Sequence, residues 1–295
     1  MNQARKQTEK IIDILYDRLE EKPSKKPITQ RIVAKKEYLK IAKKRRVTKK
    51  QRRKAIKKQL QYINRNLGHI KLLQTSGAKL GWLNKQQYKM LLVVATVYQQ
   101  QLSMYENKQQ RIDDRIVSLT QPHIRPIVRG KAGTPVEFGA KLSVSYQNGY
   151  VFIDRLSWNN FNESGDLKLQ AEEFKIATGN YPESIHVDQI YRTQENRAWC
   201  KERGIRITGV PLGRPPKIID REAKKQAQLD ERFRSRIEGK FGEAKRRFSL
   251  NRVMTKLSET SQTAIAIIFL VMNLSTLLRQ LFAFFCIYLR IDTFL

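Results

Sequence analysis

The residues Ser184-Ile-His-Val-Asp188 form a short apolar run that ends on a carboxylate, and a second acid stands within Arg234-Ser-Arg-Ile-Glu238-Gly-Lys-Phe-Gly-Glu-Ala-Lys245. The first run is typical of a buried strand, and the second is typical of a charged helix. On such a helix Arg234, Glu238 and Lys245 share one face, because they are four and seven residues apart. We therefore predict that Asp188 and Glu238 form one site flanked by two cations, although a salt-bridged surface helix would show the same spacing.

Strand and helix patterns alternate through the second half of the chain. Residues 138–146 alternate apolar and polar side chains, and Asn148-Gly149 after them is a strong signal for a two-residue hairpin turn. Gly179 can end a helix and Thr193 can cap the next one. The predicted order is strand 138–146, strand 150–156, helix 166–178, strand 185–188, helix 193–203, strand 205–210, a turn at 213–216 and a charged helix 220–248.

The first 120 residues are predicted to be helical and basic. Apolar residues at helical spacing indicate helices over 7–21 and 84–119, and Asn84 can cap the second of them. Between them, residues 31–66 contain sixteen Lys or Arg and one acid, Glu37. We expect the basic helix and the helix 84–119 to pack as an antiparallel hairpin, followed by a loop rich in Pro and Gly over residues 121–135.

The basic segment 31–66 is the strongest candidate for binding a polyanion. Lysines at this density repel one another unless an anion screens them, so we predict that the helix binds a phosphate backbone. The alternatives are a solvated charged face and a partly disordered arm. The cations that we assign to nucleic-acid binding are Lys43, Arg45, Arg46, Lys49, Lys50, Arg52 and Arg53.

The chain as a whole is strongly basic. Its 58 Lys and Arg exceed its 27 Asp and Glu, which gives a formal charge of +31. A balance of this size favours nucleic acid over an acidic protein as the partner. Two cysteines, Cys200 and Cys286, and three scattered histidines exclude a disulfide scaffold and a zinc cluster. The polar N-terminus is not that of a signal peptide.

Residues 263–288 are the most apolar stretch of the chain. A membrane helix needs about 20 nearly uninterrupted apolar residues, whereas Asn273, Arg279 and Gln280 interrupt this run. We therefore predict a buried core helix rather than a membrane span, with residues 286–295 as a tail.

The element order after residue 138 resembles a ribonuclease-H-like fold, an α/β (α+β) arrangement with a mixed sheet flanked by helices, without its first strand. That fold has acids on the first strand, on the fourth strand and on a late helix, and Asp188 and Glu238 match the last two positions. Carboxylates on adjacent elements can bind two Mg²⁺ or Mn²⁺ ions, which activate a water or a 3′-hydroxyl and stabilise the leaving oxygen of a phosphodiester. The basic helical hairpin would then be an insertion on the N-terminal side.

Several motifs resemble the DDE-type transposases of bacterial insertion sequences. The pattern Arg234, three residues, Glu238, six residues, Lys245 is similar to a motif of this family, although Glu231 stands where some relatives have an aromatic residue. Similar runs are Pro126-Ile-Val-Arg-Gly-Lys131, Val136-Glu-Phe-Gly-Ala-Lys141, Gly179-Asn-Tyr-Pro182, Asp188-Gln-Ile-Tyr191 and Leu212-Gly-Arg-Pro215.

This resemblance implies that Asp188 and Glu238 are the second and third of three catalytic, metal-binding acids. The first acid is expected on a strand before the helical hairpin, but the acids of residues 13–21 lie on a predicted helix and Asp154 is in the wrong topological place. The resemblance therefore implies a truncated copy. Its parts would be a helical insertion in residues 1–120, the catalytic core in residues 121–285 and the tail.

The function implied by this resemblance is DNA transposition of a mobile element. It includes binding of double-stranded transposon ends and target DNA, followed by metal-dependent strand cleavage and transfer. The resemblance implies a cytoplasmic protein at the nucleoid without a membrane anchor, and it allows a homodimer on DNA. The lack of a first acid leaves open whether the chain is active by itself. The alternative is a non-catalytic basic protein that binds DNA or RNA through residues 31–66.

Overall fold

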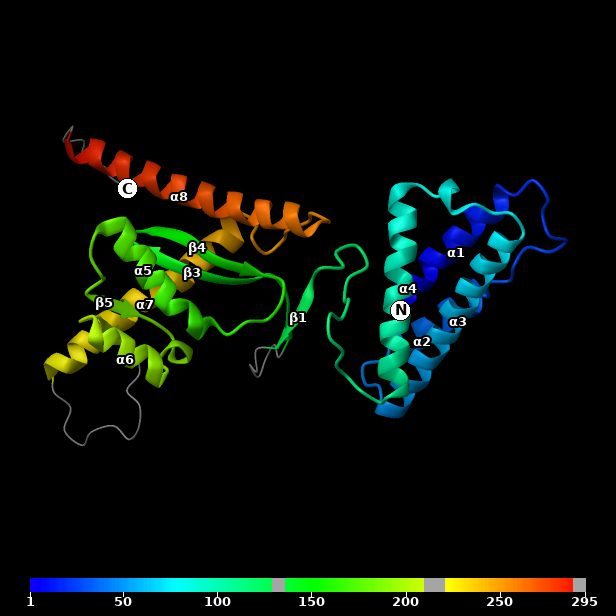
Figure 1. Cartoon of the computed structure of the whole chain (residues 1–295), viewed down its shortest axis with the longest axis horizontal. Coiled ribbons are helices and arrows are strands. Elements are labelled where there is room, and N and C mark those ends of the chain that lie inside the picture. Colours follow the sequence, from blue (N-terminus) through cyan, green and yellow to red (C-terminus); the bar gives the residue numbers. More distant parts are fainter. Residues whose placement is uncertain (129–135, 210–220, 289–295) are drawn as a thin grey trace. The chain divides into compact units, whose positions relative to one another are not determined.

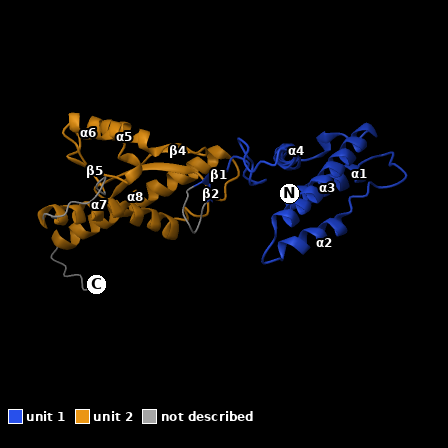
Figure 2. Cartoon of the chain, turned by 90° about the horizontal axis from the view of Figure 1, so that it is seen from below, with its two compact units in different colours: residues 1–138 blue, residues 139–295 orange. Residues whose placement is uncertain are grey.

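The computed structural model of the chain describes residues 1–128, 136–209 and 221–288. Of the described residues, 61% are helical and 11% lie in strands, a mixture that agrees with the predicted α+β class. It divides into two units, Met1–Phe138 and Gly139–Leu295 (Figures 1 and 2). The predicted turn at residues 213–216 lies outside the described residues.

Antiparallel helices form the first unit. Leu60 shares one core cluster with Val94, and Leu73 shares the other with Leu91, so the third and fourth helices run antiparallel as predicted. The fourth helix ends at Glu106 rather than at residue 119. The helices of this unit in the described residues are α1 (Asn2–Asp17), α2 (Arg31–Ala42), α3 (Lys49–Thr75), the 3-10 turn η1 (Leu80–Trp82) and α4 (Lys85–Glu106).

The basic segment is two helices, and the prediction of a single helix over residues 31–66 is wrong. α2 ends at Ala42, and α3 begins after Thr48, whose hydroxyl oxygen accepts a hydrogen bond from the N–H of Gln51 at 3.2 Å. The Gln51 side chain accepts in return from the Thr48 N–H, which completes a capping box. The Thr-x-x-Gln pattern is the sequence signal for this break.

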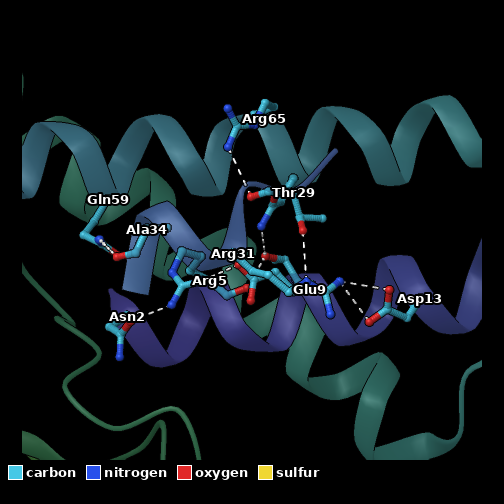
Figure 3. Close-up of polar contacts among 11 residues, drawn as sticks. Asn2, Arg5, Glu9, Asp13, Thr29, Arg31, Ala34, Gln59 and Arg65 are labelled. Carbon is cyan, nitrogen blue, oxygen red and sulfur yellow. Dashed lines mark hydrogen bonds and ion pairs between the residues drawn. The ribbon is translucent and has the colours of Figure 1, made fainter. Parts of the chain in front are cut away.

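Buried polar contacts fix α1 within the first unit, and α1 begins several residues before the predicted residue 7. Arg5 is buried, forms an ion pair with Glu9 and donates to Asn2 Oδ1 at 2.9 Å (Figure 3). Asn66 of α3 donates to the Thr8 hydroxyl at 3.0 Å. Because an unpaired charge is costly to bury, Arg5 and Glu9 have to become buried together.

The second unit combines short strands with long helices. Its described elements are β3 (Lys141–Gln147), β4 (Tyr150–Ser157), η2 (Glu163–Gly165), α5 (Asp166–Thr178), β5 (Ser184–His186), η3 (Gln189–Tyr191), α6 (Gln194–Glu202), β6 (Arg206–Thr208), α7 (Arg221–Arg247) and α8 (Ser258–Tyr288). Before these elements in the chain, β1 (Arg125–Val128) pairs with β2 (Val136–Gly139). β1 lies in the segment predicted to be a loop, and the strand predicted over 138–146 is interrupted between Gly139, whose φ is +146°, and Lys141.

The predicted hairpin is confirmed. β3 and β4 are antiparallel, and Gln147 pairs with Tyr150 across the turn. Asn148 and Gly149 both adopt positive φ, 50° and 98°, as a type I′ turn requires. The predicted caps Asn84, Thr193 and Gly179 are confirmed too, since each begins or ends its helix at the expected residue.

The strands do not form one sheet within the described residues. They form three two-stranded sheets, β1–β2, the antiparallel pair β3–β4 and the parallel pair β5–β6. The structure therefore confirms only the general α+β class. A continuous mixed sheet is not observed in this part of the chain.

α8 packs with one face on the core of the second unit (Figure 1). Its residues Ile265, Phe269 and Met272 are buried in one cluster with Val151, whereas the opposite face, with Leu278, is exposed. The prediction of a buried core helix is therefore right for one face and wrong for the other. Within the described residues, α8 is the one helix that is long and apolar enough to cross a membrane by length and composition, and 22% of its most apolar window is buried.

Candidate active site

The two predicted acids come together through Arg234. Asp188 follows β5 and begins the 3-10 turn η3. The Arg234 Nη1 donates to Asp188 Oδ1 at 2.5 Å and to Glu238 Oε1 at 3.3 Å. The same nitrogen contacts both carboxylates. Asp188 Oδ1 and Glu238 Oε1 are therefore no farther apart than the sum of these two hydrogen-bond distances.

The Asp188 and Glu238 side chains face solvent, whereas a neighbouring stripe of α7 is buried. Ile237, Phe241 and Ala244 recur at helical spacing and pack in the core of the second unit. The carboxylates lie beside this stripe, and their side chains are 65% exposed for Asp188 and 67% exposed for Glu238. Both acids are thus accessible to a ligand in solution.

A third carboxylate, Glu231, belongs to this cluster, and sequence reasoning missed it. Its oxygens accept from Arg234 Nε at 2.9 Å and from Arg234 Nη2 at 2.5 Å. These bonds raise the pKa of Arg234, with further contributions from Asp188, and lower the pKa of Glu231. The three-residue spacing on one helix was the available signal.

Lys245 lies two helical turns beyond Glu238, near the end of α7, and is exposed. In the described part of the chain, no hydrogen bond or ion pair joins it to the carboxylate cluster. Its ammonium is therefore available for an anion that crosses the helix.

A polar cluster joins β5, β6 and α7 next to the acids. Arg206 donates to both oxygens of Asp230, at 2.7 and 3.0 Å, and this contact lowers the pKa of Asp230. His186 Nδ1 lies 3.0 Å from the Thr208 hydroxyl, and its ring stacks on Phe233 with centroids 5.3 Å apart. Burial lowers the pKa of His186. These contacts fix α7 against the parallel strands, a role that the sequence did not reveal for His186.

The Asp154 side chain is hydrogen-bonded to other residues of the second unit. It accepts from the Ser145 hydroxyl at 2.9 Å and from Gln170 Nε2 at 2.6 Å, and burial raises its pKa. No contact within the described residues links it to the two acids on Arg234. Its carboxylate stabilises the packing of α5 on the β3–β4 hairpin.

The donor set for a divalent metal is incomplete in the described residues. Carboxylate oxygens such as those of Asp188 and Glu238 suit Mg²⁺ and Mn²⁺. However, no three His, Cys, Asp or Glu side chains of the described residues are grouped so that they could bind a metal ion. Arg234 supplies the positive charge at the acids instead, so the two carboxylates alone do not form a full two-metal site.

The seven cations assigned to nucleic acid come together at one place in the first unit. Lys43, Arg45 and Arg46 lie in the turn between α2 and α3, and the other four lie in the first turns of α3. All are exposed except Arg53, whose guanidinium stacks on the Tyr105 ring at 4.0 Å. The turn concentrates positive charge on a short stretch of surface, as phosphate binding requires.

These features together define a basic protein with an exposed pair of acids at the end of a parallel strand pair. Residues 185–275 match the family model described as "Transposase DDE domain". The match spans the acids and Lys245, so the resemblance to DDE-type transposases is confirmed for this stretch. No curated protein and no solved structure matches the chain.

Proposed function

We propose that this protein is an insertion-sequence transposase that binds double-stranded transposon-end and target DNA and cleaves and joins DNA strands. The observation that supports this function best is the convergence of Asp188 and Glu238 on Arg234 inside the DDE-matched stretch. In this proposal the two acids are catalytic and Arg234 and Lys245 contact DNA. A bound Mg²⁺ or Mn²⁺ would supply Lewis acidity to the phosphodiester.

The separation of the strand pairs supports a ribonuclease-H-like core that lacks one strand. In the described residues β3 pairs with β4 alone and β5 with β6 alone, which leaves both outer edges of each pair unpaired. The Tyr191 side chain, just after β5, lies close enough to Ser143 of β3 to interact with its hydroxyl, so the two pairs are neighbours. A strand between them would complete a mixed sheet, and its end would lie near Asp188. We propose that this strand brings the first acid.

The remaining parts of the proposal follow from charge and from the family. Residues 1–120 would be the helical insertion, which binds duplex phosphates through the cations of the α2–α3 turn. Residues 121–285 would be the catalytic core, and residues 286–295 a tail. The protein would act in the cytoplasm at the nucleoid, as a homodimer on DNA.

The test uses the chain extended by its upstream coding sequence, with a transposon-end duplex and Mn²⁺. Asp188→Asn and Glu238→Gln are each expected to abolish nicking and to leave duplex binding unchanged. Glu231→Gln is the matched control, because it changes an exposed acid of the same helix that also contacts Arg234. Nicking that survives Asp188→Asn would remove Asp188 from the active site.

A non-catalytic DNA- or RNA-binding protein is the second candidate. The exposed cations concentrated at the α2–α3 turn favour it, because binding of phosphates there needs no carboxylate pair. Under this alternative the extended chain binds nucleic acid with a steep salt dependence and shows no nicking at any Mn²⁺ concentration.

A further inference from the structure

A wide cleft lies within the first unit, outside the stretch that matches the transposase domain. Its volume is about 1,770 Å³, larger than the roughly 300–1,000 Å³ of most small-molecule pockets. Its walls come from the start of α1, from α2, α3 and α4, and from residues 110–128 and 136–138. A cleft of this size suits a segment of a polymer.

The charge of the cleft is almost entirely positive. The acid of its lining, Glu37, forms an ion pair with Lys58 and accepts a hydrogen bond from Tyr62 at 2.8 Å. The cations of the lining are Lys40, Lys44, Arg52, Lys54, Lys58, Arg111 and Arg115. Apart from Lys58, none of them forms an ion pair with a carboxylate of the described residues, so an anion would relieve their mutual repulsion.

The same cleft also exposes apolar and aromatic surface. Tyr38 is 39% exposed and Phe138 is 62% exposed, and Val117 and Val128 add exposed aliphatic surface. A duplex offers phosphates to such a cleft but keeps the faces of its bases stacked inside. A single strand offers phosphates together with free base faces, which stack on aromatic rings.

We propose that this cleft binds a single-stranded stretch of DNA, with its phosphates on the cations and its bases against Tyr38 and Phe138. The proposal deepens the proposed function and rests on it only for the choice of DNA as the polymer. It adds a second mode of binding, because the cations Lys43 and Arg45 of the α2–α3 turn are not part of the cleft lining, whereas Arg52 belongs to both surfaces.

The test measures fluorescence anisotropy of the full chain with a dye-labelled oligo-dT of about 12 nucleotides and with a duplex of the same length. Tyr38→Ala and Phe138→Ala are each expected to weaken oligo-dT binding about 10-fold, the effect of removing one stacked base, and to leave duplex binding unchanged. Tyr38→Phe keeps the ring and should keep the affinity. The control is Tyr88→Ala, since Tyr88 is 43% exposed on α4 and does not line the cleft.

The cations offer a second matched pair that depends on no aromatic ring. Lys54 and Lys57 are both exposed on α3, but Lys54 lines the cleft and Lys57 does not. Lys54→Gln is expected to lower the slope of log K against log salt for oligo-dT by about 0.7, and Lys57→Gln to leave it unchanged.

Four results would overturn the proposal. The first is that Tyr38→Ala and Phe138→Ala weaken duplex binding as much as oligo-dT binding, and the second is that Tyr88→Ala weakens oligo-dT binding equally. The others are displacement of oligo-dT by poly-glutamate at equal charge, and binding of oligo-rU without binding of oligo-dT. These measurements need no divalent metal and no cleavage. A negative result for single-strand binding by the cleft can therefore be distinguished from a negative result for the proposed nuclease function.

Discussion

Arg234 donates a 2.5 Å hydrogen bond to Asp188, although Arg234 lies on α7 and Asp188 begins the 3-10 turn η3 after β5. The same nitrogen contacts Glu238, so the guanidinium stands between these two acids of the stretch that matches the transposase model. A divalent cation at these acids would have to compete with that positive charge. The arginine would therefore determine how easily these acids bind a metal ion.

Removal of the guanidinium is expected to strengthen metal binding. Exposed ion pairs of this kind contribute about 0.2–1 kcal/mol each, so Arg234→Gln should lower the Kd of Mn²⁺ about fivefold, measured by electron paramagnetic resonance of free Mn²⁺. Arg232→Gln removes an exposed cation from the same helix and should have a smaller effect. Weaker Mn²⁺ binding by Arg234→Gln would mean that the arginine orients the acids for the metal.

Local signals in the sequence were sufficient for much of the second unit. Asn148-Gly149 has the two positive φ values that a tight hairpin needs, and Thr193 and Gly179 begin or end helices through contacts within a few residues. The i, i+4 spacing of Arg234 and Glu238 likewise predicted that they share a face. Each of these features depends on residues close together in the chain.

Features that depend on distant partners could not be predicted in the same way. The ion pair of Arg206 with Asp230 joins β6 to α7, and nothing in either segment identifies the other. The exposed face of α8 was unpredictable too, because composition shows that a helix is apolar but not how many of its faces are covered. The break between α2 and α3 had a local signal, the Thr48-x-x-Gln51 capping pattern, but the uniform density of lysines around it obscured this signal.

Asn273 attaches α8 to the β4 strand, and its removal is expected to destabilise the second unit. Its Oδ1 accepts from the Val151 N–H at 2.9 Å, and its Nδ2 donates to the Val151 carbonyl at 2.8 Å. Asn273→Leu would leave both part-buried backbone groups without partners, at a cost of about 2 kcal/mol in the free energy of unfolding, measured in urea. The control is Leu278→Ala on the exposed face, and equal destabilisation of the two variants would contradict this role of Asn273.

The free energy of unfolding is expected to fall as the pH is lowered from 7 to 5, in part because of His186. Burial lowers the folded-state pKa of His186, while Asp230 opposes and Arg206 adds to the shift. As the pH falls, the unfolded chain therefore takes up a proton on this histidine first, near its ordinary pKa of about 6.5. The contribution of His186 to the free energy of unfolding is fully present above this pH and is lost below it.

The measurement compares urea unfolding of wild type and His186→Gln across this range. The wild type should lose stability with the steeper slope, by less than about 1.4 kcal/mol per pH unit. His123, whose pKa burial also lowers, contributes with the same sign in both proteins. The lowered pKa of Asp230 acts below this window, because its contribution is lost only as the pH falls below its ordinary value of about 3.9. Equal slopes in the two proteins would show that His186 does not titrate on unfolding.

The turn between α2 and α3 is expected to dominate binding to duplex DNA. Replacing Lys43, Arg45 and Arg46 by Gln should weaken binding and lower the slope of log K against log salt by up to about 0.9 for each phosphate that the variant no longer neutralises. Arg53→Gln should change this slope less, because the Arg53 guanidinium stacks on Tyr105.

A control with the same reduction in charge separates a local site from a general effect of net charge. Lys6, Lys10 and Lys71 are exposed in the same unit but lie away from the turn in sequence, on α1 and the later part of α3. If binding depends on the turn, this second triple Gln variant keeps most of the wild-type salt slope. If the slope falls equally in both triple variants, the duplex responds to the net charge of the unit, and the seven cations have no special role.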